Sequence, residues 1–459
     1  MLQALAEAGM NVARLNFSYG SHQSHAAVIA ELRAVGERLN QPIAILQDLS
    51  GPKLRVGELP GGEVLLVAGQ QAVLSTAEPP APNAIPLPLP ELPGALSPGQ
   101  RLLLSDGRIE LRVVAIAGPE VRCTVAVGGL LKSHQGVNVP DTILPIRAVT
   151  DKDLADLEFG LSHGVDWVAM SFVRTAGDLI PLRARIAASG QRVALMAKIE
   201  KHEAIRHLEE IVAQTDGVMV ARGDLGIEVP LDQVPVLQKR IIALANRMGK
   251  PVITATQMLE SMVSNPRPTR AEVSDVANAV LDGTDAVMLS GETAAGKYPR
   301  EAVQVMAEVA VQAEAAFDYR SYLARSREAP CETITEAIAE AAVSLARDLG
   351  ARAIITPTTS GATATMVAHY RPETPIVAIA NGVETQRRLA LVWGVHCLYA
   401  PRAGSTDEMV RTAVRAAREA GFVVEGDRVV VTAGAPAGVA GRTNLIRAEV
   451  VGGEEGMAS

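Results

Sequence analysis

The sequence predicts an α/β protein with three parts: a (β/α)₈ barrel, also called a TIM barrel, a small β domain inserted into it, and a C-terminal doubly wound α/β domain. Three observations lead to this fold class. Short aliphatic runs alternate with helical patterns in two separate stretches, as in right-handed βαβ units with parallel sheets. The alternation stops between about residues 52 and 148. Hydrophobic residues make up 48% of the 459 residues and aromatic residues only 3%, so the cores are aliphatic, as around buried parallel strands.

Seven segments are predicted to be strands of the barrel, with helical segments such as 202–214 between most of them. Each strand ends in polar or charged residues, as barrel strands do at the rim that carries an active site. The predicted strands are 12–17, 43–49, 166–172, 193–200, 217–224, 251–258 and 286–292. A closed barrel needs eight strands, but the chain opens with the helical segment MLQALAEAGM, which Gly9 ends. We therefore expect the first strand of the barrel to be missing.

The segment inserted into the barrel has no convincing helix. Alternating runs such as VRCTVAVGGLL, and the proline-rich stretch PPAPNAIPLPLPELPG, favour a separate small β-barrel domain. After an interval of weak pattern that ends near Pro330, a helix and four further strands predict the doubly wound domain. The expected limits are 1–51 with 149–317 for the barrel, 52–148 for the inserted β domain and 318–459 for the C-terminal domain.

Charge and cysteine content exclude several classes of protein. The net charge of −8 gives no support to binding of nucleic acid or of an anionic membrane. No apolar run reaches the length of a membrane span, and no signal peptide opens the chain. The three cysteines, Cys123, Cys331 and Cys397, lie far apart without metal or redox spacing. We expect them to be reduced, in a cytoplasmic protein.

Charged side chains at the ends of neighbouring strands predict a metal site. Lys198 and Glu200 are two residues apart on a predicted strand and so point to the same face. Asp224, at the end of the next strand, supplies a second carboxylate. Two carboxylates together with substrate oxygens are a usual arrangement for Mg²⁺, or for Mn²⁺ in its place. A salt bridge of Lys198 with Glu200 or Asp224 explains the spacing equally well.

Two further segments carry groups that suit an anionic substrate. GDLGIEVP predicts a tight turn and a short helix, whose free N–H groups bind a carboxylate or phosphate. Arg14 and Asn16 share one face of their strand, and the Arg14 guanidinium can bind a phosphate in a fork. A surface arginine in an ion pair is the alternative.

Taken together, four segments carry a specific resemblance. NVARLNFSYG, MAKIE, DGVMVARGDLGIEVP and TATQMLESMVSNPRPTRAEVSDVANAV resemble the pyruvate kinase family in order and spacing, and the resemblance covers essentially the whole chain. It is closest to the bacterial type that bears a lysine and does not depend on K⁺. In that family phosphoenolpyruvate gives its phosphoryl group to ADP, which yields ATP and an enolate that is protonated to pyruvate.

The resemblance implies roles for matching residues. Glu200 and Asp224 would hold the Mg²⁺ that carries the substrate. Lys198 would neutralise charge on the phosphoryl group in flight, which stabilises the transition state. Arg14 would contact the phosphate. The inserted β domain would close over the site as a lid and exclude water.

The resemblance assigns the remaining substrate contacts as well. The backbone amides of Gly223 and Asp224 would bind the substrate carboxylate. Thr256 would lie beside the enolate, with a bound water as the proton source. Arg55 would face the nucleotide phosphates, and Asn16 would contribute to the nucleotide site.

The segment DLSGPK departs from the family pattern. Most familiar members need K⁺, which is held by residues that match Asn16, Ser18, Asp48 and the residue after it. They typically read Asp-Thr-Lys-Gly-Pro-Glu here, so Lys53 replaces a glutamate and Leu49 replaces the threonine ligand. We hypothesise that the Lys53 ammonium takes the role of the monovalent cation, so that K⁺ is not required. A solvated hinge lysine is the alternative.

The C-terminal domain contains a loop that binds a regulatory sugar phosphate in relatives. The matching stretch is TPTTSGATA, whose candidate phosphate donors are Thr358, Thr359, Ser360, Gly361 and Thr363. The basic residues that hold a second phosphate in some relatives are Thr359 and Ala362 here, which favours a monophosphate effector over a bisphosphate. A structural loop without ligand is the alternative.

Two other functions remain open at this point. One is a Mg²⁺-dependent barrel lyase that acts on a keto acid through Glu200 and Asp224; it leaves the lid and the C-terminal domain without a role. The other is a non-catalytic subunit that senses a sugar phosphate, which a missing barrel strand would allow. The resemblance further implies a homotetramer.

Overall fold

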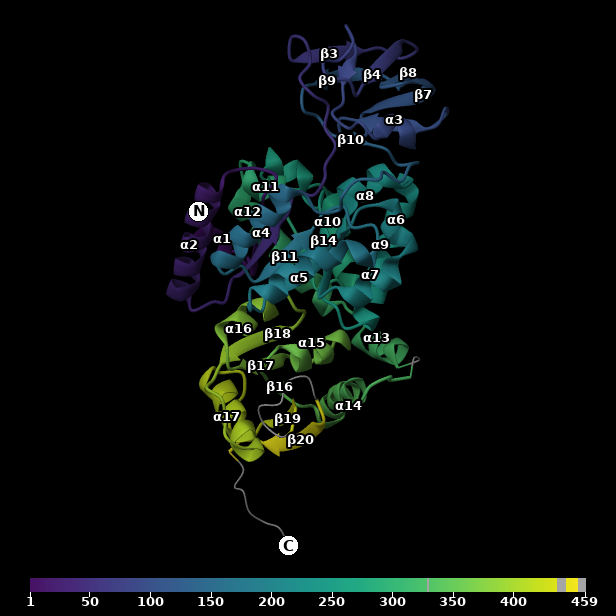
Figure 1. Ribbon diagram of the computed structural model, residues 1–459. Helices are drawn as coiled ribbons and strands as arrows, with labels where there is room; N and C mark the ends of the chain where they lie inside the picture. Colours follow the sequence, from purple (N-terminus) through teal and green to yellow (C-terminus); the bar gives the residue numbers. More distant parts are fainter. Residues whose placement is uncertain (328–329, 436–442, 453–459) are drawn as a thin grey trace.

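The computed structural model describes residues 1–327, 330–435 and 443–452. Three parts follow one another along the long axis of the molecule (Figure 1). A small β domain forms one end, a curved parallel sheet wrapped in helices forms the middle, and an α/β domain forms the other end. The domain limits given above remain a prediction, and the end of the third, residues 453–459, lies outside the described residues.

Seven parallel strands form the wall of the barrel, in the order in which they occur in the sequence. All seven were predicted, although most are shorter than expected. They are β1 (Val12–Asn16), β2 (Ala44–Asp48), β11 (Trp167–Met170), β12 (Ala194–Ile199), β13 (Gly217–Ala221), β14 (Val252–Ala255) and β15 (Ala286–Met288). In the described part of the chain, β15 and β1 are the edges of this sheet and no eighth strand pairs with them.

The helices surround this wall. They are α1 (Leu2–Glu7), α2 (His22–Leu39), α4 (Asp151–Ser162), α5 (Ile180–Ala188), α6 (His202–Arg206), α7 (Leu208–Gln214), α8 (Arg222–Glu228), α9 (Val234–Arg247), α10 (Arg270–Leu281), α11 (Gly291–Ala294) and α12 (Pro299–Ala315), with 3₁₀ turns at Ala176–Leu179, Leu231–Gln233 and Glu260–Val263. Helix α1 packs against α12, and a side chain at Gly9 would come within 3.1 Å of Ala307.

Two predictions about these elements were wrong in detail. The segment 202–214 is two helices, α6 and α7, which are separated at His207. The strand predicted over 217–224 ends at Ala221, and α8 begins directly after it. Asp224 therefore lies in the first turn of a helix and not at a strand end. Its backbone amide belongs to the free N–H groups of that turn, so the helix supports a negative charge there.

The barrel interior is closed at its amino end by the third domain. Trp167, Met196 and Ile253 fill the interior from three strands, and Leu391 of the C-terminal domain packs into the same cluster. Leu391 is only 2% exposed. Apolar side chains fill this end of the barrel, and the polar groups lie at the opposite, carboxyl end of the strands.

The inserted domain consists of two sheets around one apolar core. Its six-stranded sheet has the order β10-β6-β7-β8-β4-β5, and β3 pairs with β9. The elements are β3 (Glu63–Leu66), β4 (Gln71–Ser75), β5 (Ile85–Pro86), β6 (Arg101–Leu104), β7 (Ile109–Ala117), β8 (Glu120–Val127), β9 (Gly129–Lys132), β10 (Val137–Asn138) and the single turn α3 (Leu92–Ala95). The chain enters at Pro52–Leu54 and leaves after β10, so both connections lie beside the carboxyl rim of the barrel.

The C-terminal sheet has the order β18-β17-β16-β19-β20. Its strands are β16 (Ala353–Thr358), β17 (Ile376–Ala380), β18 (Val395–Tyr399), β19 (Arg428–Ala433) and β20 (Leu445–Val450), and its helices are α14 (Ile334–Leu349), α15 (Ala362–His369), α16 (Val383–Leu389) and α17 (Thr406–Glu419). The four predicted strands are present and parallel. The antiparallel β20, and α13 (Tyr319–Ser326) at the start of the domain, were not predicted. Strand order reverses between β16 and β19, the switch point where such sheets bind ligands.

A buried arginine joins this domain to the barrel. Arg371 is 1% exposed, and its Nη2 donates to the Asp285 carboxylate at 2.9 Å, the Asn246 side chain at 2.8 Å and the Gly283 carbonyl at 2.7 Å. Its guanidinium also lies 5.0 Å from the centre of the Trp393 ring. Both charges are buried and paired, so removal of one leaves the other uncompensated.

We expect Arg371→Met to lower the free energy of unfolding by about 3–5 kcal/mol, because it leaves Asp285 buried without its cation. The exposed pair of Arg347 with Asp348 is the matched control, and Arg347→Met should cost less than about 1 kcal/mol. The midpoint of thermal unfolding measures both effects. Equal midpoints for the two variants would contradict the account of this contact.

Candidate active site

Two cations and two carboxylates meet at the carboxyl rim of the barrel. Lys198 at the end of β12 has its Nζ 3.3 Å from Asp48 Oδ1 at the end of β2 and 3.3 Å from Glu200 Oε2. The same ammonium donates to Ser171 Oγ at 2.7 Å. Arg14 on β1 donates through Nε to Asp48 Oδ2 at 2.7 Å, and its Nη2 lies 2.6 Å from the same oxygen. Parallel strands that end at one rim thus bring residues far apart in the sequence into one charged cluster.

Burial and charge together set the protonation of this cluster. Burial alone would raise the pKa of Asp48, but Lys198 and Arg14 outweigh it and lower that pKa. Burial acts against the charge of Lys198 too, yet Asp48 and Glu200 raise the pKa of its ammonium. Burial raises the pKa of Glu200 to about 7; Lys198 opposes this, and the negative charge of Asp224 adds to it. The cluster keeps Lys198 charged inside the protein.

Glu200 has the features of a metal ligand. It is fully buried, and its Oε1 accepts a 2.6 Å hydrogen bond from the backbone amide of Phe172. Its Oε2 has no hydrogen-bond partner and lies 3.3 Å from the Lys198 ammonium, with which it forms an ion pair. Asp224 faces the same cluster from α8 with its carboxylate partly exposed. A buried carboxylate oxygen without a donor, together with a second carboxylate, suits an oxygen-seeking divalent ion.

The structure also brings together Thr256 and Gly223. Thr256 follows β14 with φ of 73°, a left-handed conformation that a threonine adopts only under constraint. Its hydroxyl donates to the Ala255 carbonyl at 2.6 Å and accepts from the Gly223 amide at 2.8 Å. The Thr256 carbonyl in turn accepts from Arg222 at 2.7 Å. The predicted contact of the Gly223 amide with a substrate therefore competes with a bond inside the protein.

Lys53 lies between the lid and the barrel. Its Nζ is 3.8 Å from Asp106 Oδ1 of the inserted domain and 3.9 Å from Asp224 Oδ1 of α8. In the described residues no ion pair joins Lys53 to Asp48, which is occupied by Arg14 and Lys198. The lysine is therefore not a freely solvated hinge residue; it is 30% exposed and lies next to a predicted Mg²⁺ ligand.

The other predicted nucleotide and cation residues lie at the end of β1 and in the connection to the lid. Asn16 accepts the Ser18 amide through its side chain at 3.0 Å, just beyond β1. Arg55 lies in the entering connection of the lid and donates to the His134 carbonyl at 3.0 Å. Asn16 lies opposite Asp48, a member of the Lys198 cluster, in the pairing of β1 with β2. The roles of Asn16 and Arg55 remain predictions for a nucleotide that would span the rim and the lid.

The predicted effector loop connects β16 with α15 at the switch point of the third domain. Gly361 has φ of 91°, and its amide donates to Thr358 Oγ1 at 2.9 Å. The Thr363 hydroxyl is buried and lies 2.9 Å from that of Thr443. Ser360 is approached by a cation, since Arg388 donates to its carbonyl at 3.2 Å. Thr359, Ser360 and Gly361 therefore border a positive charge beside a helix start.

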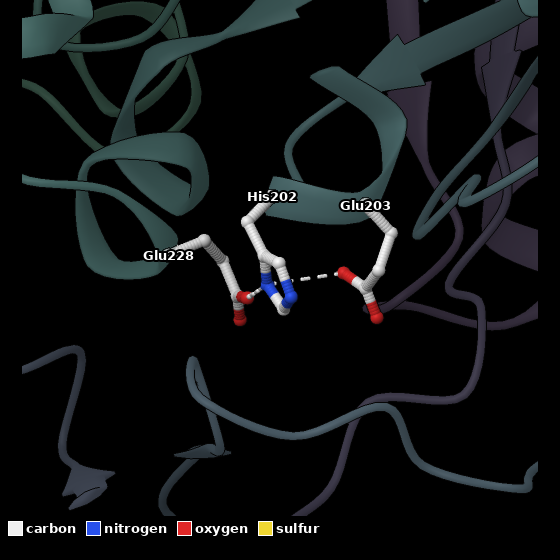
Figure 2. A group of neighbouring side chains, drawn as sticks. All are labelled: His202, Glu203 and Glu228. Atoms are coloured by element: carbon white, nitrogen blue, oxygen red, sulfur yellow. Dashed lines mark hydrogen bonds and ion pairs between the residues drawn. The ribbon is translucent and has the colours of Figure 1, made fainter. Parts of the chain in front are cut away.

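A second cluster of potential ligands was missed by the sequence analysis. His202 and Glu203 open α6, and Glu228 ends α8 (Figure 2). One ligand atom from each lies within 4.8 Å of the others. The sequence contained a signal for this cluster, because His202 follows the predicted metal ligand Glu200 by two residues and Glu228 follows Asp224 by four. Only the packing of α6 against the end of α8 reveals that they meet.

Comparisons with known proteins agree with this geometry. Residues 1–303 match the family model described as the pyruvate kinase barrel domain, and residues 336–448 match that of the pyruvate kinase alpha/beta domain. The pyruvate kinase of Geobacillus stearothermophilus is 48% identical over 455 residues, which cover 98% of this chain and 77% of the relative. Pyruvate kinase 2 of Synechocystis is 48% identical over 456 residues, which cover 98% of this chain and 76% of the relative.

A third relative, the pyruvate kinase of Clostridium acetobutylicum, is 43% identical over 454 residues, which cover 98% of this chain and 96% of the relative. None of the helices in the described residues is long and apolar enough to cross a membrane. Two family models that together match most of the chain, and identities well above 30% over nearly its full length, are decisive. The chain belongs to the pyruvate kinase family, and its enzyme class is that of a phosphotransferase.

Proposed function

We propose that this chain transfers the phosphoryl group of phosphoenolpyruvate to ADP through the cluster around Lys198, and that the enolate left behind is protonated to pyruvate. The observation that carries the proposal is a buried ammonium held charged between Asp48 and Glu200 at the carboxyl rim. A fixed positive charge in a dry site stabilises negative charge that develops on a transferring group far more than it would in water.

Lys198 and Arg14 bind the phosphoryl group in this proposal. Asp48 bridges the two cations and so fixes both side chains before substrate arrives. Because phosphoryl transfer gains most from positioning and charge stabilisation, side chains oriented in advance lose little entropy in the reaction. Ser171 restrains Lys198 further by accepting its 2.7 Å hydrogen bond.

Glu200 and Asp224 would hold Mg²⁺, or Mn²⁺, which would bind the substrate oxygens and neutralise part of their charge. The buried Oε2 of Glu200, without a hydrogen-bond donor, supports this role. The amide of Asp224, in the first turn of α8, would bind the substrate carboxylate, and the Gly223 amide would join it once released from its hydrogen bond to Thr256 Oγ1. Thr256, held in a left-handed conformation, borders the same turn and would orient the water that protonates the enolate.

Lys53 would replace the monovalent cation and make K⁺ unnecessary. Its position 3.9 Å from Asp224 supports a role beside the metal and the phosphates, and not within the Asn16, Ser18 and Asp48 set. Its contact with Asp106 links the same charge to the lid. Closure of the lid would then bring the nucleotide, Arg55 and Lys53 together and exclude water.

The keto-acid lyase and the non-catalytic subunit are less consistent with a full pyruvate kinase match that keeps this cluster. We further propose the domain limits 1–51 with 149–317, 52–148 and 318–459, a cytoplasmic location, and a homotetramer. The domain limits rest on the points along the chain at which one sheet gives way to the next. The cytoplasmic location rests on the free cysteines, and the homotetramer rests on the resemblance.

We also propose that a sugar monophosphate binds the loop from Thr358 to Thr363. The loop lies at the switch point of its sheet, precedes α15 and has Arg388 beside it. A single guanidinium with the hydroxyls of Thr359 and Ser360 suits one phosphate better than two.

Lys198→Met should lower kcat for ATP formation by roughly 10²–10³-fold or more, because it removes a fixed charge from the transferring group. Lys239→Met is the control; Lys239 is exposed and pairs with Asp282 away from the rim, so kcat should stay unchanged. Coupled assay of pyruvate formation measures both. A Lys198 variant with wild-type kcat would refute the assigned role.

Lys53→Glu should make activity depend on K⁺, because it restores the residue found in K⁺-dependent relatives and removes the tethered cation. The exposed lid residue Lys132, which pairs with Glu63, provides the control Lys132→Glu. Rates in tetramethylammonium buffer and after addition of KCl give the answer. If the Lys53 variant responds to K⁺ as the parent does, the cation role is lost.

Titration calorimetry with ribose 5-phosphate, glucose 6-phosphate and AMP should give binding heat for at least one of the three. Arg388→Gln should weaken that binding about tenfold or more, since the loop loses its neighbouring charge. The control Arg347→Gln, which alters an exposed arginine of α14 that pairs with Asp348, should leave the affinity as it is. Absence of heat with all three ligands would end the monophosphate proposal.

A further inference from the structure

His202, Glu203 and Glu228 form a cluster at the junction of the barrel and the lid, apart from the Lys198 cluster. His202 Nδ1 lies 3.1 Å from Glu203 Oε2 and 3.3 Å from Glu228 Oε2 (Figure 2). The three side chains point toward one another from the start of α6 and the end of α8. One imidazole nitrogen therefore faces two carboxylate oxygens at once.

Glu203 gives an independent sign of a missing ligand. Glu203 is 5% exposed, and its Oε2 has no hydrogen-bond partner although this oxygen faces the cluster. The imidazole nitrogen is near, but not in hydrogen-bond geometry with this oxygen. A buried carboxylate oxygen without a donor is costly unless another positive partner, such as a metal ion, satisfies it.

Glu228 is arranged as a ligand that binds through one oxygen. Its Oε1 is taken by the Lys201 ammonium at 2.7 Å and by the Asn138 amide of the lid at 3.1 Å. Its Oε2 is bound only by a 3.3 Å hydrogen bond with His202 Nδ1 among the described residues. Partners that hold one oxygen of a ligating carboxylate orient the other oxygen toward the metal, and proteins commonly arrange metal ligands in this way.

The two distances from His202 Nδ1 are compatible with one class of metal. Four ligands at about 2.0–2.1 Å from a tetrahedral Zn²⁺ lie about 3.3–3.4 Å from one another. The observed separations of 3.1 and 3.3 Å are close to that value before any ion is bound. One imidazole with two carboxylates suits Zn²⁺ better than Mg²⁺, which prefers oxygen ligands and an octahedron.

We propose that His202, Glu203 and Glu228 bind a divalent transition metal of the Zn²⁺ class, separate from the Mg²⁺ of the phosphotransferase site. A fourth position would be open to water, because Lys201 and Glu203 line a pocket between the two lid connections and the barrel. The ion would fix Glu228, the acceptor to which the lid is joined through Asn138. It would thereby stiffen the junction on which the lid moves.

The first test counts bound zinc in the full chain. Protein with saturating Mg²⁺ is dialysed against micromolar Zn²⁺, and the metal is measured by mass spectrometry. The parent should retain one more equivalent of zinc than His202→Gln or Glu203→Gln. The control His207→Gln, a neighbouring histidine that is paired with Glu210, should retain as much as the parent.

An Asp224→Asn variant separates the two metal sites. It should keep the extra zinc equivalent, because Asp224 is not among the three ligands. If Asp224→Asn loses the equivalent while His202→Gln keeps it, zinc binds in the Mg²⁺ site and the proposal is overturned. Equal zinc in the parent and both cluster variants overturns it as well.

A second readout does not depend on counting. Zn²⁺ should raise the midpoint of thermal unfolding of the parent, because a ligand that binds only the folded state stabilises it. The midpoints of His202→Gln and Glu203→Gln should not rise. Co²⁺ in place of Zn²⁺ should give visible absorption of a four-coordinate site in the parent alone. Identical shifts in the parent and in both variants would refute a site at these residues.

Discussion

The active rim depends on one constraint: a lysine ammonium must remain charged where there is little water to stabilise it. Asp48 and Glu200 meet this requirement on either side of Lys198, and Arg14 shares Asp48 with it. The same ion pairs hold these side chains in place, so they determine both the orientation and the charge of Lys198. Removal of any member would leave a buried charge without its partner, which costs more than the pair contributes.

The cluster forms because parallel strands end together. Asp48 ends β2, Lys198 lies one residue before the end of β12 and Arg14 lies on β1, so the carboxyl ends of strands in one parallel sheet bring the three charges to one rim. This much followed from the sequence, since aliphatic runs that end in charged residues are a strong signal for barrel strands. The pairing of Arg14 with Asp48, 34 residues away, did not follow, because local spacing carries no information on cross-strand partners.

Other details were set by contacts between distant segments. The strand over 217–224 was predicted too long because hydrophobic pattern does not distinguish a strand end from the helix that follows, and Asp224 moved into α8 as a result. The contact of Lys53 with Asp224 depends on how the lid sits on the barrel. The cluster of His202 with Glu228 depends likewise on the packing of α6 and α8, although each residue lies close in sequence to a predicted Mg²⁺ ligand.

The most direct test of the account is the rate at which the unaltered chain forms ATP from phosphoenolpyruvate and ADP with Mg²⁺, in potassium-free tetramethylammonium buffer and after addition of K⁺. The account predicts ATP formation at equal rates in both, because it assigns the transfer to Lys198 and the role of the monovalent cation to Lys53. Activity only with K⁺ would contradict the role of Lys53. Absence of ATP under both conditions would contradict the assignment of the rim cluster to phosphoryl transfer.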